Sequence, residues 1–226
     1  SVVNEAIKHE HTDPAAIHPR VLRPYLQSNG YNIYKKCLQN RLKRTDIIQK
    51  LKDSNLRGLG GAGFSAGLKW EIVSKQKQRP FLIVNIDEGE PGTFKDRYYL
   101  ETDPHTFLEG MLIASWVIKA EHIYIYLRDE YHACLDMLTI EIAKLSQHFG
   151  NHLPKIEIRR GAGAYICGEE SAMIESIEGK RGMPRQRPPY IAEKGLFSTP
   201  TLAHNMETLF WVKDIIAKGS DWFASY

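Results

Sequence analysis

The sequence predicts an α/β fold in which a mostly parallel, Rossmann-like sheet is flanked by helices and preceded by an N-terminal irregular arm and helix. Two observations support this prediction. The first is a set of three short apolar runs, which are typical of buried strands, and the second is that these runs alternate with long segments of helical periodicity. Strands that alternate with helices pair in parallel through right-handed crossovers, and such sheets bind ligands beyond the carboxyl ends of their strands.

The first 52 residues are predicted to form an arm and a helical segment, and residues 53–226 the main α/β domain. Prolines at 14, 19 and 24 indicate an irregular arm up to about residue 28. Apolar residues then recur at roughly helical spacing from Tyr31 to Lys52, which predicts one helix. Its basic residues are expected to form the solvated face of that helix, with an RNA-binding face as the alternative.

Each predicted strand is a short run rich in apolar, β-branched and aromatic residues. The three runs span residues 81–86, 122–127 and 155–159. Helices are predicted over 104–119, from about 130 to 149, and from about 205 to just before 219. Asp103 and Pro104 supply an N-cap and a favourable first residue for the first of these helices.

Composition narrows the class of protein. The 226 residues are 42% hydrophobic and 25% charged, which suits a globular protein with an ample core. A formal net charge of +3 is too small to indicate a nucleic-acid partner. Cys37, Cys134 and Cys167 are isolated, so we expect reduced thiols, a cytoplasmic location and no metal site. No apolar run is long enough for membrane insertion.

A glycine-rich loop followed by a lysine is the clearest candidate site. Its glycines are Gly58, Gly60, Gly61, Gly63 and Gly67, and Lys69 follows them. Bare backbone N–H groups can cradle a phosphate, to which the lysine adds a positive charge. The loop is not a Walker A motif, and its Gly-x-Gly-x-x-Gly spacing lacks the preceding buried strand of a dinucleotide fold. A flexible surface loop is the plain alternative.

Polar residues also cluster where the first predicted strand ends. Asn85 lies near its end, and Asp87, Glu88 and Glu90 follow it. Carboxylates at this position are well placed to accept hydrogen bonds from ribityl or ribose hydroxyls. An acidic turn is the plain alternative, and a Mg²⁺ cluster is less favoured because no second acidic motif completes its coordination shell.

A second glycine-rich turn follows the third predicted strand and opens a helix. It spans residues 160–171 and places Glu169 and Glu170 in the first helical turn, where the helix dipole stabilises carboxylates. Further along, Arg181, Arg185 and Arg187 lead into Tyr190. Arginines beside an aromatic could hold a phosphate and stack on a base, or they could belong to a solvated basic loop.

The last predicted helix has a polar entry. This entry consists of Thr201, His204, Asn205 and Glu207. The N-terminal N–H groups of the helix could hold a further phosphate, although a helix cap alone would also explain Asn205.

Three motifs taken together resemble one protein family. They are Arg57-Gly58-x-Gly60-Gly61-Ala62-Gly63-Phe64-x-x-Gly67-x-Lys69-Trp70, Asn85-x-Asp87-Glu88-x-Glu90-Pro91-Gly92-x-Phe94-Lys95-Asp96-Arg97 and Gly161-Ala162-Gly163-x-Tyr165-Ile166-Cys167-Gly168-Glu169-Glu170. From about Tyr25 onward the chain is similar to the NADH- and FMN-binding flavoprotein subunit of respiratory complex I, and to its relatives in NAD-reducing hydrogenases and NAD-dependent formate dehydrogenases. The run from Asp87 to Arg97 and the Leu-Phe pair before Thr201 most resemble the formate dehydrogenase beta subunit.

The resemblance implies two cofactors, FMN and NAD(H), with hydride passing between nicotinamide and flavin. The residues expected to contact the cofactors, and FMN above all, are Gly58, Gly60, Gly61, Gly63, Lys69, Asn85, Asp87, Glu88, Tyr165, Gly168, Glu169, His204 and Asn205. Phe64 and Tyr190 would sandwich the adenine of NADH, and Arg187 would contact the nucleotide. Glu90 and Glu170, the candidate catalytic residues, would act by positioning the nicotinamide nucleotide.

The family also implies partners. These are an iron–sulfur electron-transfer subunit and, in a formate dehydrogenase, a molybdenum subunit. Relatives continue into a ubiquitin-like domain and a helical domain whose cysteines bind a 4Fe–4S cluster, so this chain is expected to be a truncated form that lacks the cluster ligands. Five residues depart from the family pattern, namely Leu59, Ser65, Ile72, Tyr190 and His204. Tyr190 stands where phenylalanine is common, and it keeps a face for stacking. Ile72 removes part of the adenine platform, and His204 puts one phosphate contact in doubt.

The function predicted from the sequence is an FMN-dependent NADH:acceptor oxidoreductase module of a larger complex. Two alternatives stay open. One is a phosphotransferase that uses the glycine loop for ATP with Mg²⁺. The other is an interaction or assembly module that retains the fold with little affinity for a cofactor.

Overall fold

The computed structural model describes residues 21–58, 64–86, 99–128, 132–161, 170–180 and 190–225. Within them lies a four-stranded sheet with the order β3-β2-β1-β4, in which every neighbouring pair is parallel. The strands are β1 (Phe81–Ile86), β2 (His122–Arg128), β3 (Lys155–Gly161) and β4 (Thr201–Asn205). The predicted α/β class and the three predicted strands are therefore confirmed.

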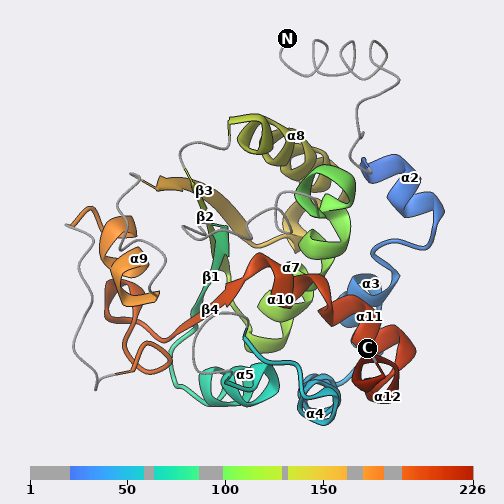
Figure 1. Cartoon of the computed structure of the whole chain (residues 1–226), viewed down its shortest axis with the longest axis horizontal. Coiled ribbons are helices and arrows are strands. Elements are labelled where there is room, and N and C mark those ends of the chain that lie inside the picture. Colours follow the sequence, from blue (N-terminus) through green and yellow to red (C-terminus); the bar gives the residue numbers. More distant parts are fainter. Residues whose placement is uncertain are drawn as a thin grey trace.

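Helices cover both faces of the sheet (Figure 1). On one face Ile83 and Ala203 pack against Met173 of α9 (Glu170–Ile177). On the other face Leu82 and Val84 belong to a larger apolar core. Both sets of alternating side chains are buried, so the strands read as continuous apolar runs in the sequence. The helices of the larger core are α2 (Leu22–Gln27), α3 (Asn32–Leu38), α4 (Arg44–Ser54), α5 (Ala66–Ser74), α7 (Pro104–Ile118), α8 (His132–Phe149), α10 (Met206–Phe210) and α11 (Val212–Lys218).

The central helix of that layer is α7, which begins as the sequence predicts. Asp103 caps it by accepting hydrogen bonds from the Thr106 backbone N–H at 3.4 Å and from the Thr106 hydroxyl at 2.7 Å. Pro104, the first helical residue, has no N–H to satisfy. The helix predicted up to residue 149 is likewise present, as α8.

The single helix predicted from Tyr31 to Lys52 is wrong, because this segment forms α3 and α4. Asn40 adopts a left-handed conformation with φ of 55°, and the chain turns there before α4 starts at Arg44. Asparagine tolerates this conformation better than most residues and often ends a helix. The apolar spacing continues across the turn because both helices bury a face in the same core. Two 3-10 turns, η1 (Gly150–His152) and η3 (Leu196–Ser198), connect elements elsewhere.

The segment from 201 to 218 also differs from the prediction. Residues 201–205, expected as a polar entry to a helix, form β4, which pairs with β1. The predicted last helix is divided at Trp211 into α10 and α11, and α12 (Ser220–Ala224) follows Gly219.

The N-terminal arm is predicted from the sequence to be irregular up to about residue 28. Residues 1–20 lie outside the described residues, and residues 22–27 are helical as α2.

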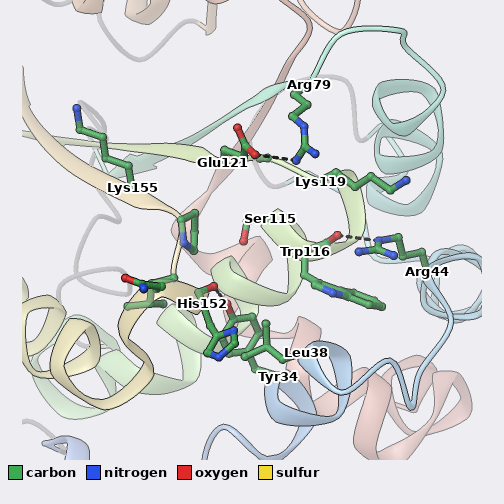
Figure 2. A pocket seen from close by; sticks show the side chains of 14 residues that line it. Tyr34, Leu38, Arg44, Arg79, Ser115, Trp116, Lys119, Glu121, His152 and Lys155 are labelled. Carbon is green, nitrogen blue, oxygen red and sulfur yellow. Dashed lines mark hydrogen bonds and ion pairs between the residues drawn. The ribbon is translucent and has the colours of Figure 1, made fainter.

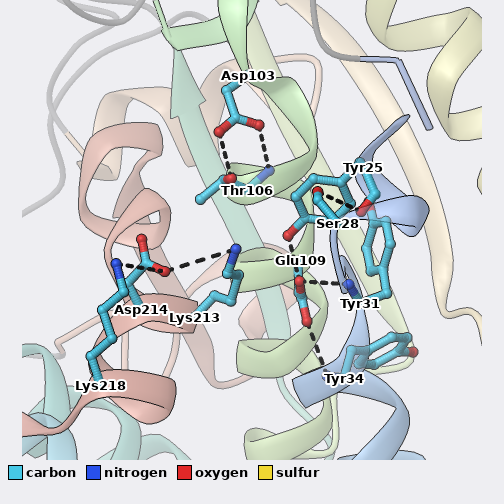
Figure 3. A network of polar contacts seen from close by, with 10 residues as sticks. All are labelled: Tyr25, Ser28, Tyr31, Tyr34, Asp103, Thr106, Glu109, Lys213, Asp214 and Lys218. Carbon is cyan, nitrogen blue, oxygen red and sulfur yellow. Dashed lines mark hydrogen bonds and ion pairs between the residues drawn. The ribbon is translucent and has the colours of Figure 1, made fainter. Parts of the chain in front are cut away.

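Glu109, in the middle of α7, attaches the N-terminal segment to the core (Figure 3). Its carboxylate accepts hydrogen bonds from the hydroxyl of Tyr25, from the backbone N–H of Tyr31 at 2.8 Å and from that of Tyr34 at 3.2 Å. Tyr31 precedes α3, so a side chain of another helix caps this N-terminus. Burial raises the pKa of the Glu109 carboxyl, although these hydrogen bonds partly offset the shift.

Residues N-terminal to 52 share the core of the sheet layer. Leu22, Tyr34 and Leu51 belong to the same apolar cluster as Leu82 of β1. The domain boundary after residue 52 stays a prediction. Cys37 and Cys134 are buried, and neither forms a disulfide. Across the residues that the structure describes, no helix is both long and apolar enough to cross a membrane.

Candidate functional site

The candidate site lies at the edge where the four parallel strands end. Asn85 of β1 and Asn205 of β4 are direct partners in the sheet register, and both come at or next to the carboxyl end of their strands. Asn85 is buried, while Asn205 is half-buried and leads directly into α10. Two predicted cofactor ligands, 120 residues apart in sequence, are thus neighbours at one edge of the sheet.

Lys69 connects three of the elements that meet at this edge. Its ammonium donates a hydrogen bond to the backbone carbonyl of Ala203 in β4 at 2.7 Å and lies 3.2 Å from a carboxylate oxygen of Glu170. Glu170 is the first residue of α9, and Lys69 lies in the first half of α5. The lysine that follows the first glycine loop therefore contacts the glutamate that follows the second glycine turn. Both side chains keep partial access to solvent, with 21% and 39% of their surface exposed.

Backbone pairing joins the two ends of the first glycine loop. Arg57 and Ser65 form an isolated antiparallel bridge, and the Gly58 N–H donates to the Phe64 carbonyl at 3.1 Å. The Ser65 hydroxyl then accepts a hydrogen bond from the Leu68 N–H and caps α5. Residues 59–63 lie outside the described residues, and the described ends of the loop are the bridge of Arg57 with Ser65, which directly precedes α5 and its Lys69.

Two glycines of the loop motif have different structural requirements. A Cβ at Gly58 would meet nothing within 4 Å. A Cβ at Gly67 would lie 2.7 Å from the backbone nitrogen of Lys52, which means that α5 can approach α4 only with glycine at this position. Gly67 is therefore explained by helix packing, whereas nothing near Gly58 requires a glycine there.

His204 has a partner that the sequence does not indicate. The indole Nε1–H of Trp70 donates to Nε2 of His204 at 2.8 Å, and both residues are buried. Burial, together with the positive charge of Lys69, holds the pKa of the His204 imidazole well below its ordinary value. His204 is therefore neutral near pH 7, and toward a phosphate it could offer only an Nδ1–H donor and no positive charge.

Two aromatic residues predicted to hold adenine are exposed. Phe64 shows 48% of its surface to solvent and Tyr190 shows 56%. Large apolar side chains with this exposure have faces available for a planar ligand.

The other predicted site residues lie outside the described residues. They are Gly60, Gly61, Gly63, Asp87, Glu88, Glu90, Tyr165, Gly168, Glu169 and Arg187. Chain connectivity nevertheless attaches several of them to the same edge, because Asp87 follows the last residue of β1 and residues 162–169 join β3 to α9. In the described ranges, no group of three or more His, Cys, Asp or Glu side chains could hold a metal ion.

Comparisons with known proteins agree on one family. Residues 51–214 match the family model described as the Nuo51 FMN-binding domain. The chain is 44% identical over 212 residues to an NADH-quinone oxidoreductase subunit of Rhizobium meliloti (strain 1021), covering 90% of this chain and 50% of that protein. It is 46% identical over 211 residues to the corresponding NADH-quinone oxidoreductase subunit of Aquifex aeolicus (strain VF5), covering 89% and 49%. The chain spans about half the length of these curated relatives.

One solved structure is similar to this chain in both fold and sequence. It is the crystal structure of an NAD⁺-reducing nickel–iron hydrogenase in the H₂-reduced state, which superposes with a TM-score of 0.75 at 44% identity. The match covers 80% of this chain and 32% of the hydrogenase chain.

Proposed function

Because this chain belongs to the family of Nuo51 FMN-binding domains, we propose that it binds FMN at the carboxyl edge of its sheet and transfers hydride between NAD(H) and that flavin. The observation that carries the proposal is the contact of Lys69 with Glu170 and the Ala203 carbonyl. It brings the residues that follow both glycine motifs to the strand end that bears Asn85 and Asn205.

The described residues fit the chemistry of a phosphorylated flavin. A phosphate is bound by a cation and by N–H donors. The Lys69 ammonium can supply the charge, and the backbone of the loop between Arg57 and Ser65 can supply the donors. The amide of Asn85, buried at the strand end, can donate to and accept from a polar flavin edge or ribityl chain. His204, being neutral, would add a donor only.

When bound, FMN would supply the hydride-accepting chemistry, and this chain would supply binding and orientation. Phe64 and Tyr190 would hold the adenine of NADH between exposed rings. Glu170 would contact the nicotinamide nucleotide from the start of α9, where Lys69 fixes its carboxylate. Glu90, Arg187 and the remaining predicted ligands keep their proposed roles at positions beyond the described residues.

We further infer that the module acts within a larger complex. Relatives of the chain are named as subunits of NADH-quinone oxidoreductases, which supports an iron–sulfur electron-transfer subunit as the partner that receives electrons. A parent complex of the formate dehydrogenase type, with a molybdenum subunit, rests on residues 87–97 and on the Leu196-Phe197 pair. Copurification of the native complex with a formate-dependent NAD⁺ reduction assay would distinguish the two.

The test is a titration of the purified chain with FMN, followed by anaerobic addition of NADH. We expect quenching of flavin fluorescence on binding and bleaching of the visible flavin band by NADH. Lys69→Met should weaken FMN binding about tenfold to hundredfold, as expected for a lost charge-assisted hydrogen bond. Lys77→Met removes the same charge from an exposed turn beyond α5 and should leave binding unchanged.

Three outcomes would contradict the proposal. Equal FMN affinity of the wild type, Lys69→Met and Lys77→Met would show that Lys69 does not contribute to FMN binding. Bound flavin that NADH fails to bleach would favour an interaction module. Binding of ATP with Mg²⁺ in a protein that takes up no flavin would favour a phosphotransferase.

A further inference from the structure

A cavity lies at the opposite end of the sheet from the proposed flavin site (Figure 2). Glu121 and Lys155, which stand at the amino-terminal ends of β2 and β3, both line it. α3 and the last turn of α7 form its other walls. Its volume of about 610 Å³ is that of a binding pocket rather than a surface irregularity. None of the residues predicted for FMN or NADH lines it.

Cationic side chains dominate the rim of this cavity. Arg44, Arg79, Lys119 and Lys155 line it, against the single carboxylate of Glu121. The whole chain has 30 basic and 27 acidic residues, so removing these four and this one leaves 26 of each. The formal positive charge of the chain therefore equals the charge gathered around this one cavity.

Part of that charge is uncompensated within the described residues. Arg79 pairs with Glu121 at 2.9 Å, and Lys155 pairs with Glu157, outside the cavity, at 3.4 Å. Among the described residues Lys119 forms no ion pair. The Cζ atom of the Arg44 guanidinium lies 3.9 Å from the centroid of the Trp116 ring, and the Arg44 Nε donates to the Trp116 backbone carbonyl at 3.0 Å. The two terminal nitrogens of Arg44 remain available for another acceptor.

Leu38, Leu153 and Tyr34 line the cavity and form what is called its floor below, and the charged rim is open. Leu38 and Leu153 are half-buried in the floor, beside buried Tyr34. On the rim, Arg79 and Lys155 each expose about two-thirds of their side chain, at 64% and 67%. A small ligand normally loses 70–90% of its surface to its pocket, which so open a rim cannot provide. A longer segment that crosses the cavity gains enough contact.

The position of Arg44 disfavours nucleic acid as the occupant. Single-stranded nucleic acids need free aromatic faces on which bases stack. Arg44 lies over a face of Trp116. The combination of cations around an apolar floor instead suits carboxylates that flank an aliphatic side chain.

We propose that this cavity docks an acidic segment of a partner protein, with an aliphatic side chain on the floor formed by Leu38 and Leu153 and carboxylates against Lys119, Arg44 and Arg79. The proposal is independent of the flavin site. An occupant here would leave the carboxyl edge of the sheet open, so a partner could dock while the site turns over.

The test uses a fluorescein-labelled twelve-residue peptide that repeats Glu-Leu-Asp, measured by fluorescence anisotropy at low salt. A peptide that repeats Gln-Leu-Asn has the same size without charge. We expect the acidic peptide to bind and the neutral one to bind at least tenfold more weakly. The double variant Arg79→Gln/Lys119→Gln should lose about tenfold in affinity, since each rim charge contributes modestly.

The matched control is Arg23→Gln/Lys194→Gln, which removes one arginine and one lysine from exposed positions outside the cavity. It should bind like the wild-type protein. Lys119→Gln alone disrupts no ion pair among the described residues, so it keeps the test valid if the double variant is unstable.

Equal binding of the acidic and neutral peptides would overturn the proposal, as would equal losses in the cavity and control variants. Tighter binding of an oligouridylate that the cavity variants abolish would assign the cavity to nucleic acid instead.

Discussion

Trp70 donates its indole N–H to Nε2 of His204 across 2.8 Å, and this bond joins α5 to β4 beneath the candidate site. An indole nitrogen can only donate, so Nε2 of His204 must accept. The proton of the neutral imidazole therefore resides on Nδ1. Trp70 follows Lys69 directly, which means that one turn of α5 supplies both the ammonium of the site and the residue that sets this tautomer.

The first prediction concerns the pH dependence of stability. Because burial lowers the pKa of His204 in the folded protein, the unfolded chain binds a proton below about pH 6.5 that the native protein does not. His204 should therefore contribute a loss of unfolding free energy, up to about 1.4 kcal/mol per pH unit, as pH falls below 6.5.

Urea denaturation of the wild type and of His204→Asn between pH 7 and pH 5 measures this contribution. The variant should show a shallower decline than the wild type. His132→Asn replaces an exposed histidine and should keep the wild-type slope. Identical slopes in all three proteins would show that His204 is protonated in the native state.

The second prediction concerns Glu109. Glu109→Gln should destabilise the protein by about 2–3 kcal/mol, because an amide offers one oxygen where the carboxylate uses two, and its NH₂ group would face an N–H donor. Equilibrium urea denaturation provides the measurement. Glu121→Gln, which loses only an exposed pair with Arg79, should cost no more than about 1 kcal/mol. A Glu109→Gln protein as stable as this control would mean that the carboxylate does not anchor α3.

The third prediction concerns the contact of α7 with α10. A Cβ at Gly110 would lie 2.0 Å from the carbonyl oxygen of Leu209, which belongs to the backbone and cannot move independently. Gly110→Ala should therefore cost about 3 kcal/mol or more in unfolding free energy. Gly58→Ala, with nothing within 4 Å, should change stability by less than about 0.5 kcal/mol. Thermal and urea unfolding measure the stability of both variants. Equal stability of the two would show that Gly110 does not lie as close to Leu209 as described.

The fourth prediction separates the two cofactors. Phe64→Leu and Tyr190→Leu should each raise the KM for NADH about tenfold, because stacking on adenine is lost, while FMN affinity stays unchanged. Steady-state reduction of an artificial acceptor gives KM, and flavin fluorescence gives FMN affinity. Phe197→Leu removes a similarly exposed ring, 52% accessible, that is not predicted to touch a nucleotide. A rise in KM for Phe197→Leu as large as for the other two variants would contradict the proposal that Phe64 and Tyr190 stack on adenine.

Local pattern predicts elements that carry their signal within a few residues. The strand at 81–86 is buried on both faces and reads as an unbroken apolar run. The start of α7 depends on neighbouring residues alone, since Asp103 caps Thr106 three positions later. Local pattern fails at β4, where Thr, His and Asn appear within five residues and resemble a helix entry. That segment is a strand because β1 offers it a complete ladder of hydrogen bonds.

The candidate site divides in the same way. By itself the sequence determined which residues are candidates for the chemistry, because glycine loops and the acidic run after a strand are local features of residue type and order. Tertiary structure alone decided that Lys69 meets Glu170, 101 residues away, and that His204 is bound by Trp70. It also decided that Glu109 caps α3 through the backbone of Tyr31, which lies 78 residues before it. The reason is that spacing along a chain encodes the conformation of a segment, whereas a partner is chosen by the free energy of burying polar groups together, which depends on the packing of the whole fold.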